Sequence, residues 1–225
     1  MTVLENRAPA TGAPAARSIL PALSITGGAT FAAAVAIAGW LDPGYSQRSE
    51  GISALASTES QGAGVMIAGF VALAVSGLAA GAALVRAAQN RTGRIAGGLV
   101  VVAGLLTLVA GFARQSCSSF QQSCLDRESA GLVTGSHVVH NLVALLGFLL
   151  LVVAAGLLTA SLRRNPVQRK LFRIALVAVL AEVALFVVIG AQAYGSGGGL
   201  GQRLFVLLAY GLPILAATRL SADRA

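Results

Sequence analysis

The sequence predicts an all-α, polytopic membrane protein, a six-transmembrane-helix bundle with the N and C termini cytoplasmic. Three observations predict this fold class. Hydrophobic residues make up 56% of the 225-residue chain and charged residues only 11%, with a mean hydropathy of +0.80, well outside the soluble range. Six apolar runs are each long enough to cross a hydrocarbon core of about 30 Å. The basic residues concentrate in alternate gaps between these runs.

The six runs lie, in chain order, near 19–40, 61–85, 94–113, 131–161, 171–193 and 202–219. Each supplies the roughly 20 residues that a membrane-spanning helix needs. Charged residues flank them: Asp42 after the first, Arg86 after the second, Arg94 and Arg114 around the third, Arg163 after the fourth, Lys170 before the fifth and Arg219 after the sixth. Since the gaps are short, we expect one transmembrane domain over 19–220 and no inserted soluble domain.

The two ends of the chain are expected to lie outside the bundle. Residues 1–18, rich in Ala and Pro, predict a disordered cytoplasmic tail, and residues 221–225 a short one. Arg7 and Arg17 before an apolar run also resemble the basic region of a secretory signal. The apolar run from Ile19 to Leu41 is longer than the hydrophobic region of such signals, so we expect the first helix to be retained.

The charge pattern predicts which ends of the helices face the cytoplasm. Twelve basic residues fall on one side, namely Arg7, Arg17, Arg86, Arg91, Arg94, Arg163, Arg164, Arg169, Lys170, Arg173, Arg219 and Arg224. Only Arg48, Arg114, Arg127 and Arg203 fall on the other, together with Asp42, Glu50, Glu59, Asp126 and Glu128. By the positive-inside rule the first side is cytoplasmic. The predicted location is the cell (plasma or inner) membrane, as a multi-pass protein.

Glycines at helical spacing indicate where helices pack closely. Gly77 and Gly81 lie in the second run, and Gly93 and Gly97 at the start of the third. Small residues four apart let helix backbones approach in lipid. This spacing fits packing within the bundle, and also the contact surface of a homodimer.

The two cysteines, Cys117 and Cys124, share the third connection, on the side predicted to face out. An oxidising exterior favours a disulfide between them. Two free thiols and a metal-binding pair are the alternatives, although two sulfurs alone do not complete the four ligands of a structural zinc site.

Polar residues at the outer ends of four runs are the candidate site. Counted at about 1.5 Å per residue from the inner end of each run, Asp42, Arg114, His140 and Arg203 reach similar depths. His137 lies one helical turn from His140, and a connection carrying Asp126 would lie above them. Such a group could bind a metal ion, a phosphate or a lipid headgroup. Alternatively, Arg114 and Arg203 could pair with Asp42 or Asp126 and fasten the outer ends of the helices, and the histidines could be satisfied by loop carbonyls or interfacial water.

Glu182 lies near the middle of the fifth run, with no second acidic residue in that run. An acid at this depth is either hydrogen-bonded within the bundle or part of a proton relay. Its distance from His140 along the membrane normal makes direct pairing with the histidines unexpected.

Several function classes lack their motifs. The chain has no glycine-rich phosphate loop, no Gly-x-Ser-x-Gly elbow and no His-Glu-x-x-His run, which excludes the ordinary soluble enzyme classes. Nucleic-acid binding is not expected, because the basic residues are scattered among short loops without aromatic platforms.

Three segments resemble a known family. They are "DPGYSQRSEGISAL" at 42–55, "CLDRES" with "HNLVALLGF" between 124 and 148, and "GLGQRLFVLLAYGLPILAATRL" at 199–220. Together they resemble the bacterial integral membrane family catalogued as domain of unknown function 998, over roughly 20–220. The resemblance implies six membrane helices and no assigned activity. The positions that match its pattern are Tyr45, Ser46, Ser49, Ile52, Ser53, Leu55, Asp126, His140 and Arg203. Gln202 stands where Glu is usual, and His137 and Glu182 lie outside the pattern.

These observations favour a non-catalytic membrane protein that binds a lipid headgroup or a membrane partner at its outer face, or that serves as an accessory subunit of an envelope complex. One alternative is a membrane-embedded lipid hydrolase or transferase. In it His140, joined by His137 and by Asp42 or Asp126, would hold a divalent metal, and Arg203 would bind a phosphate or a carboxylate. The other alternative is a small proton-coupled transporter that uses Glu182. No cofactor is expected under this favoured hypothesis. Expected partners are the lipid bilayer and either a membrane protein or a second copy.

Overall fold

The computed structural model describes residues 19–163, 165–191 and 197–223, and in these residues the chain is all-helical. Its helices, in order, are α1 (Leu20–Leu41), η1 (Ile52–Ala56), α2 (Ala63–Ala87), α3 (Arg91–Phe112), α4 (Gln122–Ser129), α5 (Gly135–Leu162), η2 (Pro166–Gln168), α6 (Arg169–Ala191) and α7 (Gly198–Ala222). The predicted tail at 1–18 and residues 224–225 lie outside the described residues.

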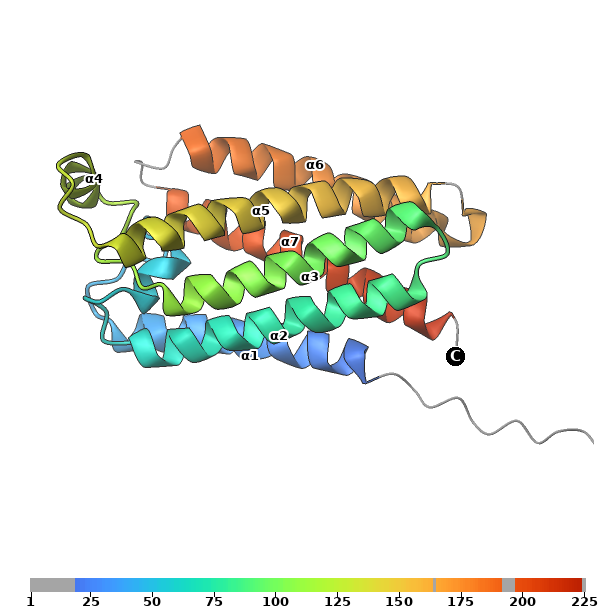
Figure 1. Cartoon of the computed structure of the whole chain (residues 1–225), viewed down its shortest axis with the longest axis horizontal. Helices are drawn as coiled ribbons and strands as arrows, with labels where there is room; N and C mark the ends of the chain where they lie inside the picture. The colour runs from blue at the N-terminus through green and yellow to red at the C-terminus, as the bar shows by residue number, and fades with distance from the viewer. Residues whose placement is uncertain (1–18, 164, 192–196, 224–225) are drawn as a thin grey trace, which may run out of the picture.

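Six of these helices, α1, α2, α3, α5, α6 and α7, are long and apolar enough to cross a membrane. They run side by side along the length of the molecule (Figure 1). This confirms the predicted all-α, multi-span fold. Large apolar side chains such as Val177, Leu180 and Val187 of α6 are more than 60% exposed, which suits a surface in contact with the lipid bilayer.

Two helices begin where a polar side chain caps them. The Asn90 side-chain oxygen accepts a hydrogen bond from the Gly93 amide at 2.8 Å, so α3 starts at Arg91 instead of near 94. The Thr134 hydroxyl accepts from the His137 amide at 3.3 Å, so α5 starts at Gly135 instead of near 131.

The predicted glycines lie between helices of the same chain. A Cβ atom on Gly81 would lie 2.6 Å from the Gly97 carbonyl oxygen, and one on Gly77 would lie 3.2 Å from the Gly104 Cα. Any side chain there would push α2 and α3 apart. The spacing of these glycines is therefore used for packing within the bundle, at the contact of α2 with α3.

The charged residues separate to the two ends of the bundle. Of the described basic residues, Arg48, Arg114, Arg127 and Arg203 lie at the end that carries α4, hereafter the α4 end. The others lie in or beside the α2–α3 turn, the α5–α6 connection and the last turn of α7, at the opposite end. This is the separation that the sequence predicted.

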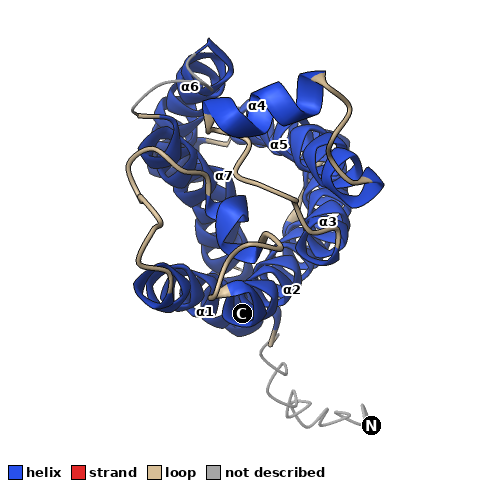
Figure 2. Ribbon diagram, turned by 90° about the vertical axis from the view of Figure 1, so that its left-hand side faces the viewer, coloured by secondary structure: helices blue, strands red, loops and turns tan. Residues whose placement is uncertain are grey.

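Short helices and connections close the α4 end (Figure 2). The connection from α1 to α2 places η1 inside the bundle, where Leu55 is fully buried and Ile52 is 4% exposed. The connection from α3 to α5 carries α4, which lies across the end of the bundle. The helix α4 was not expected from the sequence, because its eight residues are mostly polar and show no long apolar run.

Candidate functional site

Arg203 holds the first connection against α7. Its Nη1 donates to the carbonyl oxygens of Glu50 at 3.0 Å and Gly199 at 2.9 Å. Its Nη2 donates to the Tyr45 hydroxyl, and its Cζ atom lies 5.4 Å from the centroid of the Tyr45 ring. Both terminal nitrogens of the guanidinium group thus already have protein acceptors.

Tyr45 is placed by the same contacts. Its hydroxyl also donates to the Gly51 carbonyl oxygen at 3.0 Å. Burial raises the pKa of the Tyr45 hydroxyl above its ordinary value of 10.0, against the opposing attraction of the Arg203 charge. The hydroxyl therefore stays protonated as a hydrogen-bond donor across the physiological range.

The matched serines shape the turn that follows Tyr45. The Ser46 amide donates to the Glu50 carboxylate at 3.0 Å, and the Ser46 hydroxyl accepts from the Ser49 amide at 3.4 Å. Both serines thus lie in this turn, apart from the histidines. The turn then meets α7 so closely that a Cβ atom on Gly199 would lie 2.3 Å from the Glu50 carbonyl oxygen.

Arg114 fastens the end of η1 to the end of α3. Its Nε donates to the Ala56 carbonyl oxygen at 3.1 Å and its Nη2 to that of Ser57 at 2.6 Å. Arg127 pairs with Glu59 at 3.1 Å on the surface. Three of the four basic residues at this end therefore have partners within the protein, but among the described residues neither Arg114 nor Arg203 pairs with Asp42 or Asp126.

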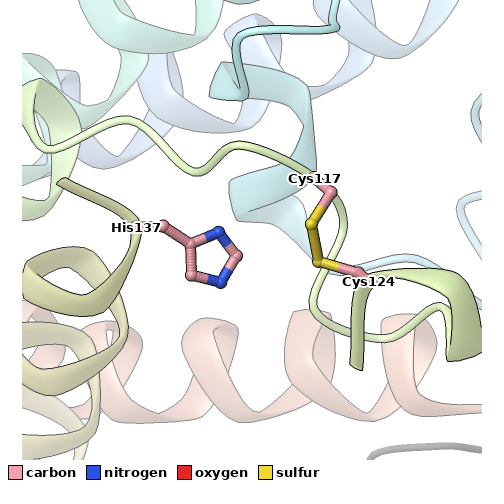
Figure 3. A group of neighbouring side chains, drawn as sticks. All are labelled: Cys117, Cys124 and His137. Atoms are coloured by element: carbon pink, nitrogen blue, oxygen red, sulfur yellow. A yellow bond between two sulfur atoms is a disulfide. The ribbon is translucent and has the colours of Figure 1, made fainter. Parts of the chain in front are cut away.

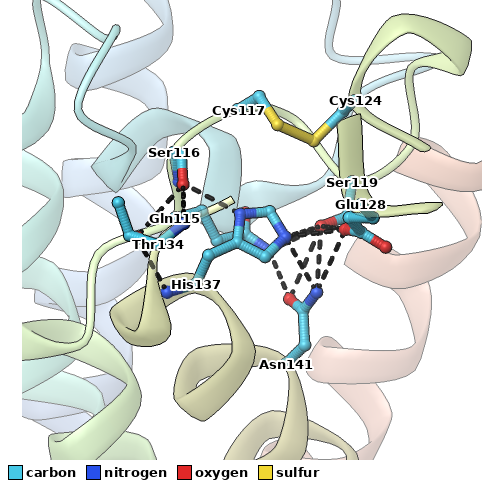
Figure 4. A network of polar contacts seen from close by, with 9 residues as sticks. All are labelled: Gln115, Ser116, Cys117, Ser119, Cys124, Glu128, Thr134, His137 and Asn141. Atoms are coloured by element: carbon cyan, nitrogen blue, oxygen red, sulfur yellow. Dashed lines mark hydrogen bonds and ion pairs between the residues drawn. A yellow bond between two sulfur atoms is a disulfide. The ribbon is translucent and has the colours of Figure 1, made fainter. Parts of the chain in front are cut away.

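The connection that carries α4 is held by a disulfide and a polar network around His137 (Figure 4). Cys117 and Cys124 are bonded, with their Cα atoms 5.6 Å apart. Nε2 of His137 lies 2.6 Å from Oε1 of Glu128, and the Asn141 side chain completes the network on the next turn of α5. His137 is 1% exposed.

The partners of His137 fix its tautomer. The Ser116 amide donates to Nδ1 at 3.1 Å, so Nδ1 carries a lone pair and the hydrogen lies on Nε2. Nε2 then donates to the Glu128 carboxylate. Both ring nitrogens have hydrogen-bond partners. Glu128 and Asn141 join the site, although the only signal in the sequence was the four-residue spacing of Asn141 from His137.

A metal centre requires free ligand atoms, and the candidate group offers few. Ligand atoms of Cys117, Cys124 and His137 lie within 4.8 Å of one another (Figure 3). The two sulfurs are bonded to each other, which removes the thiolates that bind metals. Nδ1 and Nε2 of His137 already have partners. The arrangement is a disulfide beside a histidine.

His140 points to a different set of atoms. Its Nδ1 lies 2.8 Å from the Ala110 carbonyl oxygen and 2.9 Å from that of Ala113. Since carbonyls only accept, Nδ1 carries a hydrogen, and in the neutral imidazole Nε2 then holds the lone pair. Nε2 is buried without a hydrogen-bond partner among the described residues. The two histidines do not face a common point.

The remaining predicted residues are spread out. Asp126 is exposed on α4 and accepts from the Gln122 side chain at 2.9 Å. Asp42 ends α1, where its backbone carbonyl accepts from the Tyr45 amide. Glu182 is fully buried in α6, and neither carboxyl oxygen has a hydrogen-bond partner among the described residues.

A pocket of about 470 Å³ lies beneath the α4 connection, between α5, α6 and α7. The polar residues of the lining are Ser53, Gln115, Ser118, Ser119, Glu128, His140, Asn141 and Gln202, and the α4 connection also contributes Phe120 and Leu125. Deeper in the bundle the lining is apolar, and the ring of Phe205 lies 5.0 Å from that of Phe148 and 5.9 Å from that of Phe186. Leu145 also lines the pocket and is 49% exposed, so the pocket reaches the lipid-facing surface.

Arg203 faces a separate apolar groove of about 360 Å³ between α1 and α7. Its neighbour Gln202 lines the α4-end pocket instead, and the Gln202 side-chain oxygen accepts from the Ile52 amide at 2.7 Å. Consecutive helix residues point about 100° apart, which separates the two side chains.

The family model described as protein of unknown function (DUF998) matches residues 25–219. The chain therefore belongs to this family, as its motifs predicted. The comparisons with curated proteins and with solved structures gave no match.

Proposed function

We propose that this member of the DUF998 family is a lipid-binding membrane protein that holds an amphipathic lipid in the α4-end pocket. The observation that carries the proposal is the lining of the pocket, which holds most of its polar groups beneath α4 and aromatic rings deeper in the bundle. Its volume of about 470 Å³ falls in the range of small-molecule sites. The polar part would take the headgroup and the aromatic part the first segment of a hydrocarbon chain.

The direction of the polarity along α5 supports this orientation of the ligand. Asn141 and Phe148 both line the pocket, and seven residues of helix separate them by about 10 Å along the axis. A lipid in the bilayer likewise changes from a polar headgroup to apolar chains in the direction from the membrane surface to its centre. Leu145, exposed between them, supports entry from the membrane between α5 and α6.

We place this pocket at the outer face of the membrane. The basic residues at the opposite end favour a cytoplasmic location there. The Cys117–Cys124 disulfide at the α4 end favours an oxidising compartment. The ligand would then come from the outer leaflet.

The roof of the pocket is held in place before any ligand arrives. The disulfide joins two parts of the α4 connection to each other, and the contact of His137 with Glu128 ties α4 to α5. A preformed site loses less conformational entropy on binding than a flexible one. This favours a binding role for the roof.

The test fills the pocket without touching its polar groups. Ala144 of α5 lines the pocket, and Ala144→Trp should occupy the space of the chain. Leu142→Trp is the matched control, because Leu142 is 55% exposed on the same helix. The delipidated full chain is mixed with vesicles containing equal parts of phosphatidylcholine, phosphatidylethanolamine, phosphatidic acid and monogalactosyldiacylglycerol. Retained lipid is then measured by native mass spectrometry.

The wild type and Leu142→Trp should each retain a lipid, and Ala144→Trp should lose it while keeping its melting temperature. Retention of the same lipid by Ala144→Trp would contradict the proposal, as would a wild type that retains none.

A further inference from the structure

We infer that the headgroup recognised in the α4-end pocket is a hydrogen-bond donor, a polyhydroxyl group or a primary ammonium, and not an anion. This inference rests on the proposed function, since it names the ligand class of the same pocket. Three properties of the lining carry it: the absence of cations, the unpaired acceptor of His140 and the carboxylate of Glu128.

The described residues that line the pocket include no Lys or Arg. Neither nearby guanidinium group lines it, and Arg203 lines the separate groove between α1 and α7. Arg114 donates to the carbonyl oxygens of Ala56 and Ser57, and Arg203 donates to those of Glu50 and Gly199. Recognition of a phosphate normally uses Arg or Lys in direct contact. This pocket offers neither.

His140 supplies an acceptor that nothing in the described chain uses. Its Nδ1–H is shared between the carbonyl oxygens of Ala110 and Ala113, which leaves the lone pair on Nε2. Nε2 is fully buried without a partner, and His140 as a whole is 2% exposed. A buried unpaired acceptor is unfavourable, and since His140 lines this pocket, a hydroxyl or ammonium hydrogen of a ligand that reaches the ring would satisfy it.

Glu128 gives the polar part of the pocket a negative group. Because His137 accepts from the Ser116 amide at Nδ1, its ring holds a single hydrogen and does not compensate the charge of the carboxylate. A phosphate placed here would meet a carboxylate with no cation between them. A sugar hydroxyl or an ammonium group would instead find an acceptor.

The experiment compares three lipids one at a time, each carried in phosphatidylcholine nanodiscs with the full-length protein. Monogalactosyldiacylglycerol presents hydroxyls, phosphatidylethanolamine an ammonium, and phosphatidic acid an anion. At least one of the first two should bind roughly tenfold or more tightly than phosphatidic acid. Which of the two binds more tightly distinguishes the hydroxyl source from the ammonium source.

Two substitutions separate the contributions of His140 and Glu128 to lipid binding. In His140→Asn the amide nitrogen can still donate to the Ala110 and Ala113 carbonyl oxygens, but the Nε2 acceptor is gone. It should weaken the preferred lipid by roughly tenfold. Glu128→Gln keeps an oxygen that accepts from His137 and removes the charge. It should weaken an ammonium lipid more than a hydroxyl lipid.

The outcomes distinguish this inference from the proposed function. Phosphatidic acid that binds as tightly as the other two lipids, and is lost in Ala144→Trp, would overturn the donor inference and leave lipid binding intact. Unchanged binding of the preferred lipid in both His140→Asn and Glu128→Gln would also overturn it. Failure of all three lipids to bind would overturn the proposed function itself.

Discussion

Arg203 stacks over the ring of Tyr45 and donates a hydrogen bond to its hydroxyl, although 158 positions separate the two residues in the chain. The same guanidinium group donates to the Glu50 and Gly199 carbonyl oxygens. The contact joins the first connection to the start of α7, the last helix. Arg203 is therefore a structural fastener of the α4 end.

Arg203→Lys is expected to destabilise the protein by about 1–3 kcal/mol, because a single ammonium cannot reproduce the fork of donors and the stacking. The measurement is the melting temperature in detergent. Arg48→Lys is the control, since Arg48 lies in the first connection, which Arg203 contacts, and its side chain is exposed. Equal melting temperatures for the two variants would contradict the role of Arg203.

Tyr45 should make stability fall at alkaline pH. Burial raises the pKa of its hydroxyl above 10.0, so the unfolded chain releases this proton at a lower pH than the folded one. The contribution is fully present below pH 10 and is lost as the pH rises toward the folded-state pKa. Comparing melting temperatures of wild type and Tyr45→Phe between pH 8 and 11.5 isolates it. The wild type should fall more steeply above about pH 10. Parallel curves would contradict this.

Glu128→Ala should loosen α4 and destabilise the protein by about 1–3 kcal/mol, because it leaves the buried Nε2 donor of His137 without its closest acceptor. Hydrogen exchange of the Gln122–Ser129 amides should become faster. Asp126→Ala is the matched control on the same helix, where the exposed carboxylate contacts only Gln122 among the described side chains. If Asp126→Ala had the larger effect, the network around His137 would not be what holds α4.

Glu182→Leu should raise the melting temperature, by an amount equivalent to about 1–2 kcal/mol. The carboxyl group is fully buried with no partner for either oxygen among the described residues, and Leu has a similar size. Val183→Leu is the control, at a position of α6 that is 45% exposed. A lower melting temperature for Glu182→Leu would mean that the carboxyl group has a partner that stabilises the fold.

Most of the fold could be predicted because it depends on neighbouring residues and on the order of apolar and charged residues along the chain. A run of apolar residues such as 171–193 must be a helix in lipid, where no water can satisfy its backbone. Caps at Asn90 and Thr134 refine the ends by a few residues, and they too depend on neighbours in the chain. The pairing of Cys117 with Cys124 followed from their shared connection.

The candidate site could be predicted only in outline. Counting depth selected the right end of the bundle for Arg114, His140 and Arg203, since rise per residue is constant in a helix. It could not show which way each side chain points. Asp126 was selected and Glu128 was not, yet residues two apart face opposite sides of a helix, and it is Glu128 that meets His137.

The sequence by itself determined that the bundle lies in lipid, how many helices cross the membrane and how charge separates between the two ends. Each of these follows from the composition along the chain. The tertiary structure decided how the polar groups are used. In it the guanidinium groups of Arg114 and Arg203 donate to backbone carbonyls, and His137 and His140 have different hydrogen-bond partners. Among the described residues, Nε2 of His140 has no hydrogen-bond partner, and His140 lines a pocket. These outcomes depend on contacts between segments far apart in the chain, which the sequence alone does not show.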